Sequence, residues 1–516
     1  MLLIFPPTAK PSEPPAGIAR LAGVLKGNNI PCTTLDANIE GLLFLLQLPL
    51  NSLDTWSKRA YRSIGKNLNA LKTPTLYQSP DRYTRAVVDL NRVLENIKKP
   101  GVAISLANYQ DQLSPISSSD LFQAAEHYDN NIFYPYFSER LTSLLEKTNP
   151  AHIGFSLNYL SQAVTTFSMI GFIKKIAPDL PIILGGGLIT SWASNPAWKN
   201  PFTALVEHLI PGPGEKPLLN LFGINSLSTA HCPDYGDLAL ETYLSPGFTL
   251  PYAASSGCYW NKCLFCPEKA EANPYRTLPT KQVRADIARL KRIHSPAMLH
   301  FLDNAISPAL MKSLADEPPN IPWFGFARID KDLLNLSFCK KLRDSGCVML
   351  KLGIESGDQG VLNAMDKGIE ISTISQVLNN LFVAGIATYV YLLFGTPSES
   401  LTEARRTMDF VIMHNQTIQF LNLAIFNMPV CSTESVHLET QKFSQADLGL
   451  YTDFLHPLKW SRPKIRRFLD QEFKRHAAIR PIILRDPPIF TSNHAPFFVS
   501  SLMISQKAAR HPRLAL

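Results

Sequence analysis

The stretch Ser256-Gly257-Cys258-Tyr259-Trp260-Asn261-Lys262-Cys263-Leu264-Phe265-Cys266 decides how the rest of this 516-residue sequence is interpreted. It holds three of the chain's eight cysteines, in the spacing Cys-x4-Cys-x2-Cys. Thiolates are soft ligands, so cysteines crowded in this way favour zinc or an iron-sulfur cluster. A structural zinc ion normally takes four protein ligands, often from paired cysteine motifs, and no second Cys-x2-Cys follows. Three thiolates fit a cubane cluster with one iron open to a non-protein ligand, which predicts a catalytic site.

This stretch resembles the cluster loop of the radical S-adenosylmethionine (radical SAM) enzymes, whose usual spacing is Cys-x3-Cys-x2-Cys with an aromatic residue before the last cysteine. Phe265 matches that aromatic residue, whereas the first gap is one residue longer here. The resemblance implies that Cys258, Cys263 and Cys266 bind a 4Fe-4S cluster and that Phe265 lies against the cofactor. Two other interpretations stay open: a zinc knuckle, and buried thiols beside an aromatic core patch.

Composition places the chain among ordinary globular proteins. Hydrophobic residues make up 45% and the mean hydropathy is −0.01, and no apolar run is long enough to span a bilayer. The first seven residues predict a strand rather than a signal peptide. Eight cysteines are too few for a disulfide scaffold, so we expect a reducing cytoplasmic location without membrane contact.

Most of the net charge of +8 comes from one segment near the end of this sequence. Residues 457–485 contain nine Lys and Arg against Asp470 and Glu472. General nucleic-acid binding calls for a wider basic face or a known module, so it is not expected. In the same segment Ile465, Phe468, Leu469 and Phe473 predict one apolar helix face, which packs on the domain or forms a lid over an anionic substrate.

The N-terminal part predicts an open α/β domain. Strands are expected at 2–5, 31–35, 153–157 and 181–184, with helices near 18–27 and 164–176 and a mostly helical insertion at about 40–150. The strand at 181–184 runs into Gly185, Gly186 and Gly187. Glycines at the carboxyl ends of parallel strands allow a ligand to approach the backbone.

This part resembles the cobalamin-binding domain that precedes the radical SAM core in one subgroup. The shared features are Phe5-Pro6-Pro7, a Gly17…Leu21-Ala22 helix, the three glycines and Gly214-Glu215. The resemblance implies that Gly185, Gly186 and Gly187 contact cobalamin, without the axial histidine of an Asp-x-His-x-x-Gly motif. Asp36-Ala37-Asn38 follows the second strand and imitates that motif by chance. A domain that binds nothing is the alternative.

The part from about 250 to 440 predicts a parallel barrel or part of one. Six strands are expected at 252–255, 298–303, 323–328, 348–354, 387–394 and 420–426, with helices between them. The radical SAM resemblance implies a partial (β/α)6 barrel of the TIM type. Chemistry in parallel barrels lies at the carboxyl ends of the strands.

Polar residues follow four of these strands, and the resemblance implies that they hold S-adenosylmethionine. Taken singly, such residues are more often solvated caps or surface ion pairs. Because they follow successive strands, a shared cofactor-binding site is favoured over separate surface roles. The predicted contacts are Asp303 and Asn304 for the amine, Arg328 for the carboxylate, Glu355 and Ser356 for the ribose, and Gly395 and Glu399 at the adenine turn.

Other polar residues nearby are given simpler interpretations. Asp366 and Lys367 are expected in a solvated loop, and His300 in the core. Lys351 lies inside a strand and is expected to face the lumen. No catalytic residue is predicted.

The sequence therefore predicts an α/β protein with four parts. They are a Rossmann-like, cobalamin-binding-like domain at 1–225, a linker at 226–249, a radical SAM core at 250–440 and a helical C-terminal extension at 441–516. The resemblance implies an enzyme that reductively cleaves S-adenosylmethionine at a 4Fe-4S cluster and transfers a methyl group with cobalamin. The alternatives are a non-methylating isomerase or cyclase with an empty first domain, and a non-enzymatic iron-sulfur or zinc protein. The expected partners are a small-molecule or peptide substrate and an electron donor such as flavodoxin or ferredoxin.

Overall fold

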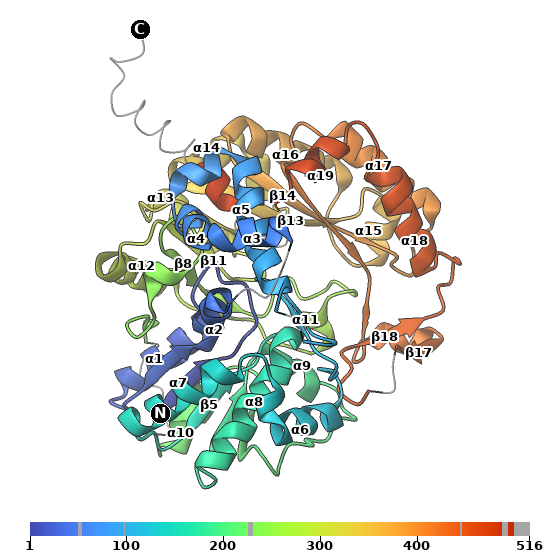
Figure 1. Cartoon of the computed structure of the whole chain (residues 1–516). Coiled ribbons are helices and arrows are strands. Elements are labelled where there is room, and N and C mark those ends of the chain that lie inside the picture. Colours follow the sequence, from blue (N-terminus) through green and yellow to red (C-terminus); the bar gives the residue numbers. More distant parts are fainter. Residues whose placement is uncertain (50–53, 98, 225–230, 444–445, 488–493, 500–516) are drawn as a thin grey trace. The chain divides into compact units, whose positions relative to one another are not determined.

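A computed structural model describes residues 1–49, 54–97, 99–224, 231–443, 446–487 and 494–499 (Figure 1). These residues form two compact units. The N-terminal unit contains residues 1–248 and 446–450, and the C-terminal unit contains 249–443, 451–487 and 494–499. Among the described residues, no helix combines the length and the apolar character needed to cross a membrane.

The N-terminal unit is built on a five-stranded parallel sheet. Its strands are β1 (Leu2–Phe5), β2 (Thr33–Asp36), β5 (Ile153–Ser156), β6 (Ile182–Gly185) and β7 (His208–Ile210), in the order β2-β1-β5-β6-β7. The order reverses between β1 and β5, as in doubly wound folds of the flavodoxin type. The connecting helices are α1 (Ala16–Gly27), α8 (Leu160–Ile176), α9 (Gly187–Ala193) and α10 (Glu215–Leu221).

Between β2 and β5 the chain makes a mostly helical insertion. α5 contacts α2, α3 and α4, and α6 and α7 contact α8. These helices are α2 (Ala37–Gln47), α3 (Thr55–Arg62), α4 (Ile64–Leu71), α5 (Pro80–Glu95), α6 (Ser118–Glu126) and α7 (Tyr134–Thr148), with the short strands β3 (Ala103–Ile104) and β4 (Tyr109–Gln110). Asp36 caps α2 by accepting from the backbone N–H groups of Asn38 and Ile39. The Asp36-Ala37-Asn38 sequence therefore begins a helix.

The C-terminal unit is built on six parallel strands. They are β8 (Thr249–Tyr252), β11 (Met298–Phe301), β12 (Trp323–Ala327), β13 (Cys347–Glu355), β14 (Ala387–Phe394) and β15 (Phe420–Ile425), in the order β15-β14-β13-β12-β11-β8. Neighbouring strands in space follow one another along the chain, as in a (β/α) barrel, and the described sheet does not close. The predicted α/β class and the partial barrel are confirmed.

Helices α12, α13, α14 and α16 follow one another in contact, with α14 on β13 and α16 on β14 (Figure 1). Their bounds, with those of the other helices between the strands, are α11 (Pro267–Ala270), α12 (Thr280–His294), α13 (Pro308–Asp316), α14 (Leu336–Asp344), α15 (Gln359–Ala364), α16 (Ile371–Ala384) and α17 (Leu401–Met413). Pro279 precedes the first turn of α12, and Thr280 is the first residue of the helix.

The segment after β15 contains both strands and helices. The predicted apolar residues Ile465, Phe468, Leu469 and Phe473 are all buried, which confirms that this face packs on protein. They span α18 (Arg462–Phe468) and the π-helical turn η6 (Leu469–Phe473), which precede α19 (Arg480–Arg485). A three-stranded sheet that was not predicted is formed by β16 (Met428–Pro429), β17 (Thr440–Lys442) and β18 (Tyr451–Phe454).

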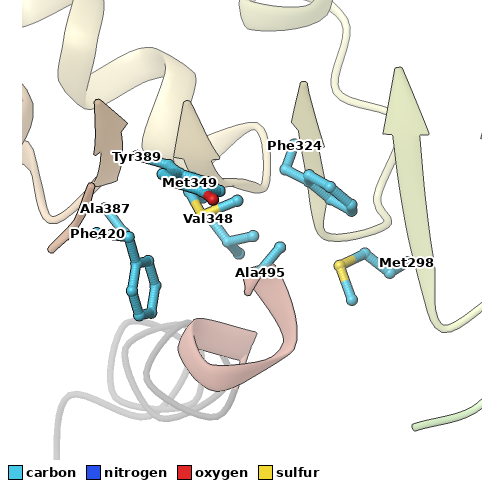
Figure 2. Close-up of a cluster of buried hydrophobic side chains, with 8 residues drawn as sticks. All are labelled: Met298, Phe324, Val348, Met349, Ala387, Tyr389, Phe420 and Ala495. Atoms are coloured by element: carbon cyan, nitrogen blue, oxygen red, sulfur yellow. The ribbon is translucent and has the colours of Figure 1, made fainter. Parts of the chain in front are cut away.

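A core cluster lies at the amino ends of five of the six strands, β11 to β15 (Figure 2). Ala495, from the short helix η8 (Ala495–Phe498), projects into it between Phe420 on one side and Met298 on the other. The cluster consists of Met298, Phe324, Val348, Met349, Ala387, Tyr389, Phe420 and Ala495. The C-terminal segment therefore completes the core at this end of the sheet.

One predicted strand is displaced. The first barrel strand was expected at 252–255, but β8 ends at Tyr252. Ser255 and Ser256 instead form β9 (Ser255–Ser256), which pairs antiparallel with β10 (Arg276–Thr277). The residues that pair with β11 lie earlier, at Thr249–Tyr252, and include Pro251, a residue that is uncommon inside a strand.

Candidate functional site

The three clustered cysteines lie on the loop that follows β8 and β9. Cys263 is 9% exposed, and Cys258 and Cys266 are half-buried. Cys266 precedes the first turn of α11, and its N–H donates to the carbonyl of Cys263 at 3.2 Å. Gly257 begins the loop with φ of 71°, and a Cβ there would lie 2.6 Å from the carbonyl oxygen of Pro274. Glycine is therefore required just before the first cysteine.

The donor set of this loop fits an iron-sulfur cluster. Burial raises the pKa of the Cys263 thiol and raises that of Cys266 to about 11, and iron ligation would displace these protons. Among the described residues, no three His, Cys, Asp or Glu side chains are gathered tightly enough to hold one metal ion. A cubane cluster does not need such a set, because its three thiolates bind three different irons.

Residues 257–266, which carry the three cysteines, are here called the cluster loop. This loop is held in place by residues 365–368, here called the clamp loop. The backbone N–H of Leu264 donates to the carbonyl of Met365 at 3.0 Å, and Trp260 Nε1 donates to the carbonyl of Asp366 at 3.2 Å. Trp260 and Asn261 lie in the gap that is one residue longer than usual, and Asn261 has φ of 46°. The loop accommodates the extra residue with a left-handed conformation at Asn261, next to the Trp260 indole that contacts the clamp loop.

Arg328 follows β12 and joins the same assembly. Its guanidinium carbon lies 3.8 Å from the ring centroid of Trp260, within range of a cation–π interaction. Its Nη2 donates to the carbonyls of Lys367 and Gly368, the latter at 3.1 Å. Both described hydrogen bonds use Nη2, so Nε and Nη1 are the donors with which it could meet a ligand carboxylate.

A buried ion pair stands beside the cluster loop. Lys367 Nζ lies 2.9 Å from Glu355 Oε1, and the two side chains are 9% and 13% exposed. The same ammonium lies 5.4 Å from the ring centroid of Phe265. The expected solvated loop is therefore wrong for Lys367, whose charge is neutralised inside the protein, although Asp366 is exposed.

Glu355 has an unusual backbone. Its φ is 70°, and the pairing of β13 with β14 shifts register between Gly353 and Glu355. A left-handed conformation in a residue other than glycine is uncommon and is often found where a side chain is aimed at a site. Here it turns the carboxylate toward Lys367.

Asp303 and Asn304 link the end of β11 to the start of the cluster loop. Asp303 is 2% exposed and accepts from Ala254 N at 3.1 Å and from the hydroxyl of Ser255. Burial raises the pKa of its carboxyl, and these hydrogen bonds oppose the shift. Asn304 is exposed, and its Nδ2 donates to the carbonyl of Gly257 at 3.3 Å. Asp303 thus organises the loop from inside, and Asn304 remains at the surface beside it.

Of the residues predicted for the ribose and adenine contacts, Ser356, Gly395 and Glu399 are buried and Glu355 is half-buried. Ser356 is fully buried and pairs with the hydroxyl of Thr407 at 3.1 Å. Gly395 has φ of 83° and donates its N–H to Glu399 Oε2. Glu399 also accepts from Trp460 Nε1 at 3.2 Å, and burial raises the pKa of its carboxyl to about 8. Its Oε1 is buried without a hydrogen-bond partner among the described residues.

A cavity of about 340 Å³ opens beside Gly395 in this unit. Its walls include Phe426 after β15, His456, Trp460 and Arg462. His456 Nε2 lies 3.0 Å from the carbonyl of Thr396, and Arg462 Nη1 donates to the carbonyl of Phe426 at 2.9 Å. Sequence reasoning missed these walls, because nothing in the tail shows which strand ends it covers.

The N-terminal unit has a separate candidate edge at the carboxyl ends of β1, β5 and β6. Thr8 is fully buried, and its hydroxyl has no hydrogen-bond partner among the described residues. The backbone of this loop is fixed by Ser161 Oγ, which donates to Thr8 O at 2.8 Å, and by Gln162 Nε2, which donates to Pro6 O at 2.7 Å. Asn38 Oδ1 accepts from Ala9 N at 2.7 Å.

The three predicted glycines lie on the same edge. Gly186 has φ of 110°, and an added Cβ would lie 2.4 Å from the carbonyl oxygen of Leu157. Gly185 ends β6, and Gly187 donates its N–H to Asn158 Oδ1 at 2.9 Å. A Cβ on Gly187 would meet no atom closer than 3.7 Å. Gly186 is thus required by the fold, whereas Gly187 leaves room for a ligand.

Comparison with known proteins gives the following findings. No model of a known protein family matches the sequence. The chain is 22% identical over 305 residues to an uncharacterized methyltransferase of Pyrococcus horikoshii. The match covers 52% of this chain and 66% of that relative, just under two thirds of its length.

A solved structure matches over almost the full chain. The radical S-adenosylmethionine methyltransferase TsrM of Kitasatospora setae, with cobalamin and a 4Fe-4S cluster bound, aligns over 99% of both chains, with a TM-score of 0.53 and 14% identity. A second structure of TsrM, with tryptophan substrate and an S-adenosylmethionine analogue, gives a TM-score of 0.54 and 13% identity. At the level of the fold, these matches confirm the resemblance to radical SAM enzymes with a cobalamin-binding-like N-terminal domain.

Proposed function

We propose that this chain is a radical SAM enzyme, with Cys258, Cys263 and Cys266 as the ligands of a 4Fe-4S cluster. The observation that carries the proposal is the position of the three cysteines. They lie on one loop after the first strand of a six-stranded parallel sheet, at the edge where such folds place their chemistry. When bound, the cluster supplies an electron for cleavage of S-adenosylmethionine, and cobalamin supplies a methyl carrier.

The chain's own residues then have distinct tasks. The clamp loop and Trp260 hold the cluster loop. Arg328 presents donors to the methionyl carboxylate, and Asn304 presents its Oδ1 acceptor to the methionyl amine. Phe265, Glu355 and the turn at Gly395 line the remaining edge. We assign Asp303, Ser356 and Glu399 to supporting this edge, because each is buried and bonded within the protein.

Anaerobic reconstitution of the full-length protein with iron and sulfide tests the proposal. We expect about four irons and four sulfides per chain, and formation of 5′-deoxyadenosine from S-adenosylmethionine under reducing conditions. Cys263→Ala should lose both. Cys431→Ala removes a half-buried cysteine outside the loop and serves as the matched control. A colourless protein holding one zinc ion would show that the proposal is wrong.

We further propose that the N-terminal unit binds cobalamin and that the reaction is methyl transfer. The doubly wound sheet places the loops after β1 and β5 at its switch point, where such folds bind ligands. The buried hydroxyl of Thr8 without a partner and the open space at Gly187 fit a ligand at this edge. TsrM, which shares the fold, is a methyltransferase with cobalamin bound.

Cobalamin absorbance after reconstitution separates this proposal from a non-methylating enzyme with an empty first domain. The expected result is one cobalamin per chain by absorbance and mass analysis, and methylated product in its presence. Cleavage of S-adenosylmethionine without cobalamin binding would favour the isomerase or cyclase alternative. The proposed domain limits of 1–225, 250–440 and 441–516, the cytoplasmic location and a flavodoxin-like or ferredoxin-like donor belong to the same proposal.

A further inference from the structure

The end of β13 is shaped around the buried ion pair of Lys367 and Glu355. Gly353 lies in this strand, and a Cβ there would lie 2.5 Å from Glu355 Oε1 and 3.1 Å from Lys367 Nζ. A side chain at position 353 would therefore force the pair to move. The register shift after Gly353 and the φ of 70° at Glu355 bring the carboxylate to the same place. Backbone irregularities that serve one side chain point to a role beyond stability.

The ammonium of the pair faces the cluster loop. Lys367 Nζ lies 5.4 Å from the ring centroid of Phe265, the residue just before the last cysteine. The clamp loop, which carries Lys367, is tied to the cluster loop by the hydrogen bond from Leu264 N to Met365 O at 3.0 Å. The Lys367 side chain is only 9% exposed. Its charge is therefore held at a fixed place beside the cysteines and is poorly screened by water.

The charges of this region act unequally on Cys263. Burial raises the pKa of the Cys263 thiol, and Lys367 opposes that shift more strongly than any other charged group, followed by Arg328. Glu355 acts in the opposite direction and more weakly. Cys263 is buried, whereas the other two cysteines of the loop are half-buried. The pair therefore presents a net positive influence to the most enclosed thiolate of the loop.

A fixed charge beside a redox site favours one of its two states. Reduction by one electron, taken from a flavin or iron-sulfur electron carrier, adds one negative charge to the site, while no bond forms or breaks and no proton moves. A nearby ammonium stabilises the more negative, reduced state, and a nearby carboxylate destabilises it. The net charge and the burial around the thiolates are among the factors that set the reduction potential of an iron-sulfur cluster.

We propose that the Lys367–Glu355 pair sets the reduction potential of the iron-sulfur site, with Lys367 favouring the reduced state and Glu355 opposing it. Lys367 acts through its charge and touches none of the reacting atoms. Glu355 holds the ammonium in place and limits how far it raises the potential. Arg328 is less suited to this role, because the methionyl carboxylate assigned to it would neutralise its charge. The proposal rests on the proposed function, since it requires the cluster.

Potentiometric titration of the full-length, anaerobically reconstituted protein, followed by electron paramagnetic resonance of the reduced cluster, tests the proposal. Glu355→Gln keeps an acceptor for Lys367 Nζ but removes the negative charge. The ratio of reduced to oxidised cluster at a fixed potential should therefore rise about tenfold, a shift of about 59 mV. The double variant Lys367→Met/Glu355→Gln also removes the positive charge and leaves no buried charge unpaired, so the ratio should fall below the native value.

Lys262→Met is the matched control, because it removes an exposed cation from the cluster loop itself. Solvent screens this charge, so the ratio should change by less than about twofold. An unchanged ratio in Glu355→Gln, or a shift of Glu355→Gln and the double variant in the same direction, would overturn the proposal. Iron and sulfide counts and 5′-deoxyadenosine formation on the same preparations report on the proposed function. A native protein without a cluster would contradict both proposals, whereas a full cluster with unshifted potentials in the variants would contradict only this one.

Discussion

The two candidate ligand edges of this molecule are stabilised by different kinds of side chains. The edge of the six-stranded sheet is held by charged groups and aromatic rings, with Arg328 on Trp260 and Lys367 paired to Glu355. The edge of the five-stranded sheet is held by neutral side chains that bond to backbone carbonyls, as Ser161 and Gln162 do. Under the proposed function, the charged edge holds the loop that carries the cluster, and the neutral edge leaves backbone groups open to a large ligand.

This difference predicts unequal sensitivity to substitution. Removing one partner of a buried ion pair leaves an uncompensated charge, while removing a hydroxyl without a partner removes nothing that the unliganded fold uses. The expected effects below run from the largest to the smallest.

Lys367→Met should be the most damaging change at the cluster edge. It leaves the Glu355 carboxylate buried and unpaired, so the free energy of unfolding should fall by about 3–5 kcal/mol. Calorimetric unfolding of the cluster-free protein measures this. Arg405→Met breaks the exposed Arg405–Glu472 pair and should change the unfolding free energy by less than about 1 kcal/mol. Equal effects of the two substitutions would contradict the contrast.

Glu399→Gln should remove a pH dependence of stability. Burial raises the folded-state pKa of Glu399 to about 8, from its ordinary value of 4.5 in an unfolded chain. Between these values the folded state holds a proton that the unfolded state releases, so stability falls as pH rises. The slope contributed is about 1.4 kcal/mol per pH unit. Urea midpoints between pH 6 and pH 8 should fall for the native sequence and remain flatter in the variant.

Trp260→Ala should weaken the cluster loop without unfolding the protein. The indole contributes one hydrogen bond to the clamp loop and a cation–π contact to Arg328, together about 1–2 kcal/mol. Iron loss to a chelator should become about 5- to 30-fold faster. Trp460→Phe, which removes the hydrogen bond to Glu399 outside the loop, should leave iron retention unchanged. Unaltered iron release from the Trp260 variant would mean that the clamp loop does not hold the cluster loop.

Thr8→Val should have the smallest effect on the unliganded protein. The hydroxyl has no partner among the described residues, so valine of the same shape should change unfolding by less than about 1 kcal/mol, in either direction. Cobalamin retention during gel filtration should nevertheless decrease if the hydroxyl contacts the ligand. Thr34→Val, at another buried hydroxyl without a described partner, separates a general effect on the unit from a local one.

The sequence was most informative where periodicity and turns carry the signal. Five of the six barrel strands lie where the apolar runs predict them, and Gly186 and Gly395 occupy positions with positive φ. It was least informative about Lys367, because nothing local shows that a lysine after a short helix meets a carboxylate twelve positions earlier. The Lys351–His300 contact joins residues 51 positions apart, so only the register of β11, β12 and β13 brings them together.

The insertion of Ala495 among the first residues of the strands has a consequence for biosynthesis (Figure 2). During translation, all six strands leave the ribosome before this segment does, so their apolar inner face stays open until residues 494–499 have emerged. Chaperone capture of this face should therefore persist until that point. A premature stop codon ahead of residue 494 should yield an aggregation-prone product, even though the three cysteines would already be in place.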